Sequence, residues 1–450
     1  MFSKETYMAR RAKLKQTIGS GLLLFLGNDE SGMNYADNTY HFRQDSTFLY
    51  FFGLPYAGLS AIIDIDNDKE IIFGDELTID AIVWMGTQPT LKEKSEAAGI
   101  KEVRPFKEIE TYLKNAQQKG QPIHYLPTYR AEHQIKLFQW LGIVPGAEKP
   151  SVPFIMGVVN QRNYEIEKAC IVTADMHLTA MRTVRPGIRE SDVAAAVAEV
   201  AFANNYQLSF PIIATINGQT LHNHDHSHMI KSGDMLLLDA GAETEMGYAG
   251  DMSSTIPADS KFTTRQKDIY DIQVAAHEAA VAALRPGIPF VDVYELSCKV
   301  IMEGLKDLGF VKGDPMEAVK AGAHAMFMPC GLGHMMGLDV HDMENLGEVY
   351  VGYDGQPKST EFGRKSLRLG RKLEPGFVLT IEPGVYFIPE LMDLWRGQNK
   401  FTEFINYEKL FTYKDFSGIR NEEDYQITEN GARLLGKKIP LRTEEVEAIR

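Results

Sequence analysis

The sequence predicts an α+β protein of two domains, in which a smaller α/β domain precedes a larger domain of paired helices around a sheet. Three observations support this prediction. The chain has 450 residues with 44% hydrophobic content, which is long for a single domain. Strand and helix patterns alternate in its first third. A short motif, Arg-Pro-Gly-Ile, occurs twice further along the chain.

In the first third, apolar runs typical of strands alternate with helical stretches. The predicted elements are the strands Leu22–Leu26, Ala61–Ile65 and Glu70–Phe73 and the helices Thr90–Ala98 and Phe106–Lys114. The aromatic residues Phe48, Tyr50, Phe51 and Phe52 favour a place in the core over a substrate-binding role.

A linker is expected where prolines gather after this region. Pro145, Pro150 and Pro153 mark it, so we expect one domain at residues 1–158 and a second at residues 159–450.

The repeated motif indicates an internal duplication. Arg185-Pro-Gly-Ile and Arg285-Pro-Gly-Ile each follow a helical stretch, Glu165–Thr183 and Asp268–Leu284, and each is followed at equal offset by Asp-Val. A second helix should begin after each motif, with Ser191 or Asp192 as the N-cap in the first copy. Duplicated helix pairs around a sheet explain this pattern, and an accidental four-residue repeat is the alternative.

Five side chains in separate apolar or glycine-marked segments are candidate metal ligands. They are Asp239, Asp251, His334, Glu382 and Glu422. A lone aspartate at a strand end is more often a turn residue, but five such segments together are costly to bury without cations. Oxygen ligands with one imidazole suit Mn²⁺, and Co²⁺ or Zn²⁺ are the alternatives.

Two of the candidates should lie in one hairpin. Asp239 ends the apolar run Met235–Leu238, and Asp251 follows a polar stretch. If the turn is centred near Glu245, the two aspartates face each other across the ladder.

The other candidates have local signals as well. His334 lies among glycines that permit close backbone approach, and Glu382 ends the strand Phe377–Ile381. Arg420 and Glu422 share one face by the period of two, so that Arg420 can orient a ligating carboxylate.

Longer motifs around these residues resemble those of a known family. Asp-Ala-Gly, Gly-Asp-Met-Ser-Ser-Thr, Gly-Leu-Gly-His-Met-Met-Gly-Leu-Asp-Val-His-Asp, Thr-Ile-Glu-Pro-Gly-Val-Tyr and Gly-Ile-Arg-Asn-Glu-Glu-Asp are similar to the metal-site motifs of aminopeptidase P and prolidase, the proline-directed "pita-bread" metallopeptidases. The segment Asn38–Tyr50 resembles the N-terminal domain of aminopeptidase P. The resemblance therefore covers nearly the whole chain.

This resemblance implies a pita-bread catalytic domain and assigns roles to individual residues. It implies two bound metal ions, bridged by Asp251 and Glu422, and it selects Glu422 over Glu423 as a ligand. Glu382 is implied as the general base, and His222 and His341 as the residues that contact substrate. The implied activity is removal of the N-terminal residue from peptides with proline in second position, an Xaa-Pro aminopeptidase.

Three alternatives compete with this interpretation. Arg368 falls where prolidase holds the carboxylate of a dipeptide, and the insert Pro389–Ser417 is also prolidase-like, which favours an Xaa-Pro dipeptidase. A non-catalytic pita-bread scaffold and a metal-free creatinase-like enzyme are disfavoured because all five metal ligands are present.

Two positions near the motifs are ambiguous. Cys330 stands where prolidase-like members usually carry histidine, and it is either a small buried residue or a thiolate that favours softer ions such as Zn²⁺. His222, His224, His226 and His228 alternate, so they form either a second metal site on one extended face or a histidine-rich loop.

Composition limits the partners. A formal net charge of −14 without a basic run argues against nucleic acid and anionic membranes. The charged N-terminal segment and short apolar runs indicate no secretion signal, and three scattered cysteines favour a reducing cytoplasm. We expect a homodimer or higher homo-oligomer acting on Xaa-Pro peptides.

Overall fold

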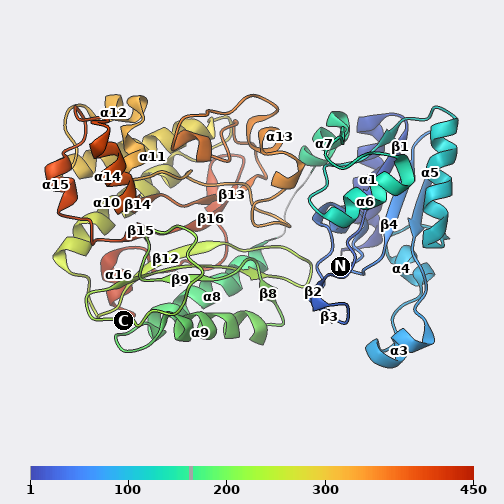
Figure 1. Ribbon diagram of the computed structural model, residues 1–450, viewed down its shortest axis with the longest axis horizontal. Coiled ribbons are helices and arrows are strands. Elements are labelled where there is room, and N and C mark those ends of the chain that lie inside the picture. The colour runs from blue at the N-terminus through green and yellow to red at the C-terminus, as the bar shows by residue number, and fades with distance from the viewer. Residues whose placement is uncertain (1, 162–165) are drawn as a thin grey trace. The chain divides into compact units, whose positions relative to one another are not determined.

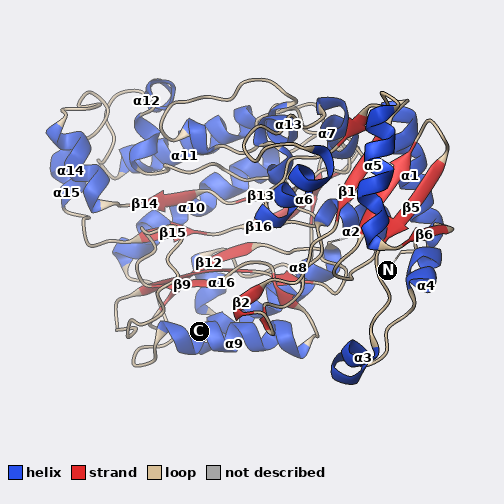
Figure 2. Ribbon diagram, turned by 45° about the vertical axis from the view of Figure 1, so that its right-hand side comes forward, coloured by secondary structure: helices blue, strands red, loops and turns tan. Residues whose placement is uncertain are grey.

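The computed structural model describes residues 2–161 and 166–450, which form two compact units (Figure 1). The N-terminal unit comprises Met1–Arg162 with Met343–Tyr350, and the C-terminal unit comprises Asn163–Asp342 with Val351–Arg450. The domain boundary expected at residue 158 stays a prediction. The α+β class is confirmed, because helices and strands alternate through both units (Figure 2).

A five-stranded mixed sheet of order β6-β5-β4-β1-β7 forms the centre of the N-terminal unit. Its strands are β1 (Leu22–Leu26), β4 (Ser60–Asp64), β5 (Lys69–Phe73), β6 (Glu102–Arg104) and β7 (Ile123–His124), and a separate hairpin contains β2 (Gly32–Tyr35) and β3 (Asn38–Thr39). The pairs β1–β4 and β4–β5 are antiparallel, whereas β1–β7 and β5–β6 are parallel. The three predicted strands are confirmed, although β4 lies one residue earlier than predicted and β5 begins one residue earlier.

The helices of this unit are α1 (Lys4–Ile18), α2 (Ser46–Phe52), α3 (Ile79–Met85), α4 (Leu91–Ala97), α5 (Ile109–Gln118), α6 (Ala131–Leu141) and α7 (Val152–Val159). The predicted helix from Phe106 opens with a 3₁₀ turn before α5. The aromatic run of α2 is buried, which confirms its core role, and Phe25 packs against Phe51 and Phe52 with ring centroids 5.4 and 5.1 Å apart. Pro153 is not a linker residue, since it lies in the first turn of α7.

The C-terminal unit is built from two similar halves. Its first half contains α8 (Glu167–Thr183), α9 (Glu190–Ala203) and the antiparallel sheet of β9 (Ile213–Thr215), β10 (Met235–Ala240) and β12 (Met252–Pro257). β8 (Gln207–Leu208) pairs with β11 (Ala242–Glu243) beside it. The helices α8 and α9 contact these strands.

The second half repeats this order. It contains α10 (Thr264–Ala283), α11 (Phe290–Asp307) and the strands β13 (Val378–Ile381), β14 (Gly384–Tyr386), β15 (Gly418–Arg420), β16 (Glu423–Ile427) and β17 (Ala432–Leu434). Its remaining helices are α12 (Pro315–Ala321), α14 (Pro389–Gly397), α15 (Tyr407–Phe411) and α16 (Thr443–Glu447). Helix α13 (Glu348–Tyr353) is divided in the chain, with Val351 as its first residue in the C-terminal unit. Figures 1 and 2 show the strands of the unit between α8 and α9 on one side and α10 and α11 on the other.

Backbone hydrogen bonds show that the Arg-Pro-Gly-Ile repeat is structural. Gly187 N donates to Ile230 O at 2.9 Å, and in the second copy Gly287 N donates to Leu373 O at 2.8 Å. Each acceptor lies five residues before a central strand, because β10 begins at Met235 and β13 at Val378. The two motifs therefore occupy equivalent places in two halves of one duplicated fold.

The helix ends differ from the predictions in detail. Glu165 lies outside the described residues, and α8 is described from Glu167. The second helix of the first half begins at Glu190, so neither Ser191 nor Asp192 is the N-cap. Asp192 instead accepts a hydrogen bond from Arg189 N at 2.8 Å, which satisfies a backbone donor of the first turn.

Within residues 2–161 and 166–450, the structure contains no helix that is both long and apolar enough to cross a bilayer.

Candidate active site

A cavity of about 430 Å³ opens in the C-terminal unit and contains every site residue predicted from the sequence. Its walls include Leu221, His222, Asp239, Asp251, Cys330, Gly331, Gly333, His334, His341, Phe362, Ser366, Arg368, Glu382, Tyr386, Arg420 and Glu422. These residues come from segments separated by up to two hundred positions, so the fold brings the candidates together.

The duplicated halves supply the four acidic candidates from equivalent positions. Asp239 is the fifth residue of β10, and Glu382 stands in the fifth place counted from the start of β13. Asp251 immediately precedes β12, and Glu422 immediately precedes β16. The halves meet here, because Ser253 and Glu422 form a β-bridge in which Glu422 N donates to Ser253 O at 3.0 Å.

His334 is fixed beside the second half by its backbone. Its N–H donates to Thr380 Oγ1 at 3.2 Å, and Thr380 N donates to His334 O at 3.0 Å. The imidazole Nε2 then lies 3.5 Å from Asp251 Oδ2 and 3.5 Å from Glu382 Oε1. One donor atom each of Asp251, His334 and Glu422 lie within 4.8 Å of one another, which is a spacing suited to a metal ion.

The carboxylates that line the cavity have the properties expected of ligands for a cation. Among the residues that the structure describes, the buried oxygens Asp239 Oδ1, Asp251 Oδ1 and Glu422 Oε1 have no hydrogen-bond partner. Burial, and then repulsion from neighbouring carboxylates, raises the pKa of Asp251 and of Glu422 well above its usual range. Divalent metal ions satisfy such oxygens and remove the repulsion between the carboxylates.

Arg420 holds several of these groups in place. Its Nη2 donates to Asp239 Oδ2 at 2.6 Å, its Nη1 to the Tyr386 hydroxyl at 3.0 Å, and its Nε to Ser253 Oγ at 2.9 Å. The same Ser253 hydroxyl donates to Glu422 Oε2 at 2.7 Å. Arg420 and Glu422 thus share one face, as the period of two predicts.

Sequence reasoning missed two residues of this network. Ser253 links Arg420 to Glu422. It stands two residues after Asp251, and this spacing in a strand could have indicated that both side chains point to the same face. Asp424 is buried beneath the site, where its Oδ2 accepts from Asp251 N at 3.2 Å and from Cys170 Sγ at 3.1 Å. Burial raises the pKa of Asp424 to about 7. Asp424 stands two residues after Glu422, so the same spacing could have indicated its place on the side of the site.

The geometry also separates the two adjacent glutamates. Glu422 lines the cavity, whereas Glu423 lies beside His277, with 3.7 Å between Glu423 Oε2 and the histidine Nε2, and accepts from the Tyr425 hydroxyl at 2.6 Å. Adjacent strand residues point to opposite faces, which explains why only one of the two reaches the cavity.

The predicted hairpin forms, but its register differs from the prediction. Asp239 faces Ser253 in the β10–β12 ladder, so the expected Asp239–Asp251 pair is wrong. The loop is centred one residue later than expected, since Thr244 N donates to Tyr248 O at 2.9 Å. Gly247, with φ 82°, takes the left-handed place that ends this loop. Asp251 consequently lies just before its strand, diagonal to Asp239.

The four alternating histidines do not form a second metal site. His226 Nε2 lies 3.1 Å from Ile212 O, and His228 Nδ1 lies 3.0 Å from Glu190 Oε2, whereas His222 lines the cavity. The segment is a loop, so the histidine-rich-loop interpretation is confirmed.

Cys330 lines the cavity. Burial and the nearby Glu382 carboxylate raise the pKa of this cysteine to about 12, which disfavours a thiolate.

The remaining predicted residues surround the carboxylates. The His341 ring lies against that of His334, with centroids 4.0 Å apart. Thr380 Oγ1 donates to Glu382 Oε1 at 3.3 Å, and burial raises the pKa of Glu382. Arg368 lines the same cavity and brings a second guanidinium to it.

Comparisons with known proteins agree with this architecture. The model of metallopeptidase family M24 matches residues 164–429, and that of the aminopeptidase P N-terminal domain matches residues 7–124. The chain therefore belongs to metallopeptidase family M24, with a pita-bread catalytic domain after an aminopeptidase P-type N-terminal domain.

Relatives with two activities match almost the whole chain. Xaa-Pro dipeptidase from Homo sapiens is 29% identical over 458 residues, covering 98% of this chain and 91% of the human protein. Xaa-Pro aminopeptidase from Escherichia coli K12 is 29% identical over 473 residues, covering 99% and 98%. A variant of E. coli aminopeptidase P in complex with substrate superposes with a TM-score of 0.82 at 27% identity, covering 100% and 98%.

The close approach at Gly333 gives a testable prediction. An added Cβ would lie 2.0 Å from Thr380 O, the backbone that anchors His334, so Gly333→Ala should displace the histidine segment and destabilise the unit by about 1–3 kcal/mol. Urea unfolding followed by tryptophan fluorescence measures this change. Gly397→Ala is the control, because its Cβ would meet nothing within 4 Å. Equal unfolding free energies for the two variants would contradict the prediction.

Proposed function

We propose that this metallopeptidase is a dinuclear metal hydrolase that cleaves the Xaa-Pro bond at the N-terminus of peptides, an Xaa-Pro aminopeptidase. The observation that carries the proposal is the buried group of four carboxylates and one imidazole, three of whose oxygens have no protein partner among the described residues. The proposed ligands are Asp239, Asp251, His334, Glu382 and Glu422. Mn²⁺ is the proposed metal, because oxygen ligands dominate this set.

Two bound cations would supply Lewis acidity and lower the pKa of a water molecule to near neutrality. The protein residues would then perform the remaining steps. Glu382 lies in the cavity with a raised pKa, so it is suited to accept a proton from the attacking water and to return it to the leaving nitrogen. His222 and His341 line the same cavity and would donate hydrogen bonds to the substrate carbonyl as negative charge develops on it.

Arg420 has a positioning role in this scheme. Its guanidinium contacts Asp239 and, through Ser253, Glu422, so it can hold two proposed ligands at fixed orientation. A direct contact with the substrate is a second proposed role of Arg420, because the residue lines the cavity, where its guanidinium donates to the Tyr386 hydroxyl.

The aminopeptidase and the dipeptidase that are candidates here differ in the length of the peptide that they accept. The likeness to E. coli aminopeptidase P over both units supports an aminopeptidase with an open cleft beyond proline. A second candidate, an Xaa-Pro dipeptidase, is favoured by Arg368, because a guanidinium in the cavity wall can bind the free carboxylate of a dipeptide.

We propose a cytoplasmic location, which the three free cysteines support. The proposed domains are residues 1–158 and residues 159–450. The acidic net charge supports peptide rather than nucleic-acid or membrane partners. The comparisons give no support to a non-catalytic scaffold.

Metal content is the first test of this proposal. The purified protein should bind two Mn²⁺ ions per chain and lose peptidase activity to chelators, and its metal affinity should rise with pH because binding displaces protons from carboxylates whose pKa is raised. Asp251→Asn should lower both metal content and rate. Asp307→Asn, on the exposed side of α11, is the control. Full activity with one ion or none would exclude a dinuclear mechanism.

The second test concerns the proton carrier. Glu382→Gln preserves the shape of the side chain but removes its ability to take a proton, so kcat should fall by about 10²-fold or more while KM changes little. The comparison requires metal content equal to that of the wild type, measured by mass spectrometry on the same samples. Wild-type turnover in a fully metallated variant would rule out Glu382 as the base.

A peptide length series distinguishes aminopeptidase from dipeptidase. With an open cleft, Ala-Pro-Ala and longer peptides should be cleaved at least as well as Ala-Pro, and Arg368→Ala should change neither rate much. Arg371→Ala is the matched control, because Arg371 pairs with Glu374 and does not line the cavity. A dipeptide preference above about tenfold in kcat/KM, worth ~1.4 kcal/mol, that is lost in Arg368→Ala alone would instead establish a dipeptidase.

Self-association can be tested at α3. This helix is set apart from the other helices of its unit in both views, and its exposed apolar residues include Ile79, Val83 and Trp84, the last 85% exposed (Figures 1 and 2). A second copy of the chain would bury this surface. Trp84→Ser should therefore shift a dimer toward monomer in light scattering, whereas Phe202→Ser on α9 should not. A monomeric wild type would contradict the proposed homo-oligomer.

A further inference from the structure

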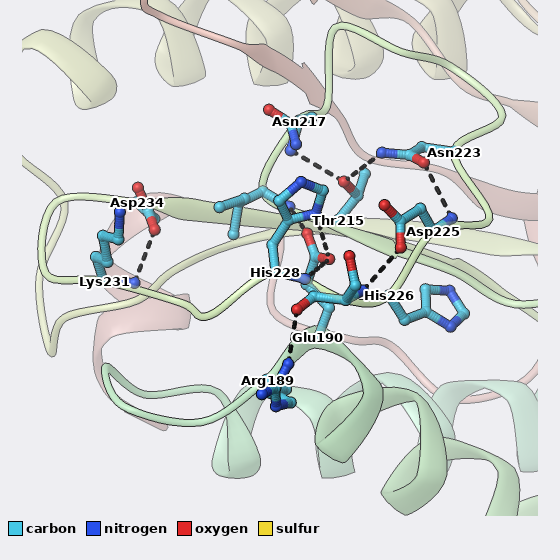
Figure 3. Close-up of polar contacts among 12 residues, drawn as sticks. Arg189, Glu190, Thr215, Asn217, Asn223, Asp225, His226, His228, Lys231 and Asp234 are labelled. Carbon is cyan, nitrogen blue, oxygen red and sulfur yellow. Dashed lines mark hydrogen bonds and ion pairs between the residues drawn. The ribbon is translucent and has the colours of Figure 1, made fainter.

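The loop that carries His222 is closed at both ends by one buried side chain, Glu190. Its Oε1 accepts a hydrogen bond from Ile216 N at 2.8 Å, before the histidine. Its Oε2 accepts from His228 N at 3.1 Å and lies 3.0 Å from His228 Nδ1, after the histidine (Figure 3). Glu190 has no solvent exposure, so its carboxylate is committed to these contacts.

Backbone and side-chain contacts around Glu190 reinforce this closure. Glu190 N donates to His228 O at 3.1 Å, and Arg189 Nη1 donates to Ser227 O at 3.0 Å. Within the loop, Thr215 Oγ1 accepts from Asn223 Nδ2 at 2.9 Å, directly after His222 in the chain (Figure 3). The loop is thus fastened to the start of α9 and to the end of β9.

In the second half of the duplicated fold, an apolar residue takes the place of this carboxylate. Glu190 is the first residue of α9, and the first residue of the equivalent helix α11 is Phe290. The backbone contact is the same in both halves, since Glu190 N donates to His228 O and Phe290 N to Arg371 O. Phe290 is fully buried as an apolar ring. Burying a carboxylate at this place is the costlier choice, which indicates a purpose beyond packing.

We propose that Glu190 is a positioning residue of the hydrolytic site, which sets the place of His222 by fixing both ends of its loop. This inference rests on the proposed function, in which His222 contacts the peptide. A charged acceptor makes stronger hydrogen bonds than a neutral one, so three N–H groups directed at one carboxylate define the loop more tightly than solvent would. The position of His222 then remains fixed when substrate enters.

Glu190→Gln tests this role with almost no change in size. The amide can accept at its oxygen only, so its NH₂ group faces one of the N–H donors and breaks part of the closure. We expect kcat/KM for an Xaa-Pro peptide to fall about tenfold, since small misplacements of catalytic groups are costly. Metal content should stay at the wild-type level, and Glu199→Gln, exposed on the same helix, should have no effect.

A double-mutant cycle separates positioning from general structural damage. If Glu190 acts through His222, Glu190→Gln should cost less than about twofold in a His222→Ala background. The same tenfold loss in both backgrounds, or no loss in either, would overturn the proposal. Should Glu190→Gln fail to fold, His228→Ala removes one contact of the closure and should show the same dependence on His222 with a smaller loss.

Hydrogen exchange provides a readout that does not depend on activity. Exchange in residues 216–228 should be faster in Glu190→Gln than in the wild type, while β10 and β13 remain unchanged. Unchanged exchange in this loop would overturn the inference. Inactivity of the wild type toward Xaa-Pro peptides would instead refute the proposed function and leave this exchange result to decide the role of Glu190 in the loop.

Discussion

The C-terminal unit depends on a balance of buried charge. Asp239, Asp251, Glu382 and Glu422 face one cavity, and the Arg420 guanidinium donates a hydrogen bond to Asp239. Burial, and then repulsion among the carboxylates, raises the pKa of Asp251 and Glu422. One oxygen each of Asp239, Asp251 and Glu422 has no partner among the described residues. Divalent cations would convert this cost into stabilisation, so metal binding and the stability of the site are linked.

Duplication explains how the chain places these groups. Each half contributes one acid from the fifth position counted from the start of a central strand and one acid from the residue before the strand that pairs with it. The Ser253–Glu422 bridge brings the two sets together. The halves differ in the residue that begins their second helix. Glu190 fastens the His222 loop in the first half, whereas Phe290 fills the equivalent place in the second.

The sequence predicted much of this arrangement because its signals are local. The apolar run before Asp239, the glycines around His334 and the two Arg-Pro-Gly-Ile motifs each describe a short stretch of backbone, and the structure places each as expected. The register of the β10–β12 hairpin was wrong by contrast, because a left-handed Gly247 moved the loop centre by one residue. Asp424, Ser253 and Glu190 were missed since their importance lies in contacts with residues distant in the chain.

The central claim is that the two halves of a duplicated fold meet around a pair of metal ions. Crystals of the protein grown with Mn²⁺ and measured at the manganese absorption edge test this claim directly. We expect two anomalous peaks per chain, both between the carboxylates of Asp239, Asp251, Glu382 and Glu422, with His334 bound to one of the two ions. A single peak, or peaks outside this cavity, would contradict it.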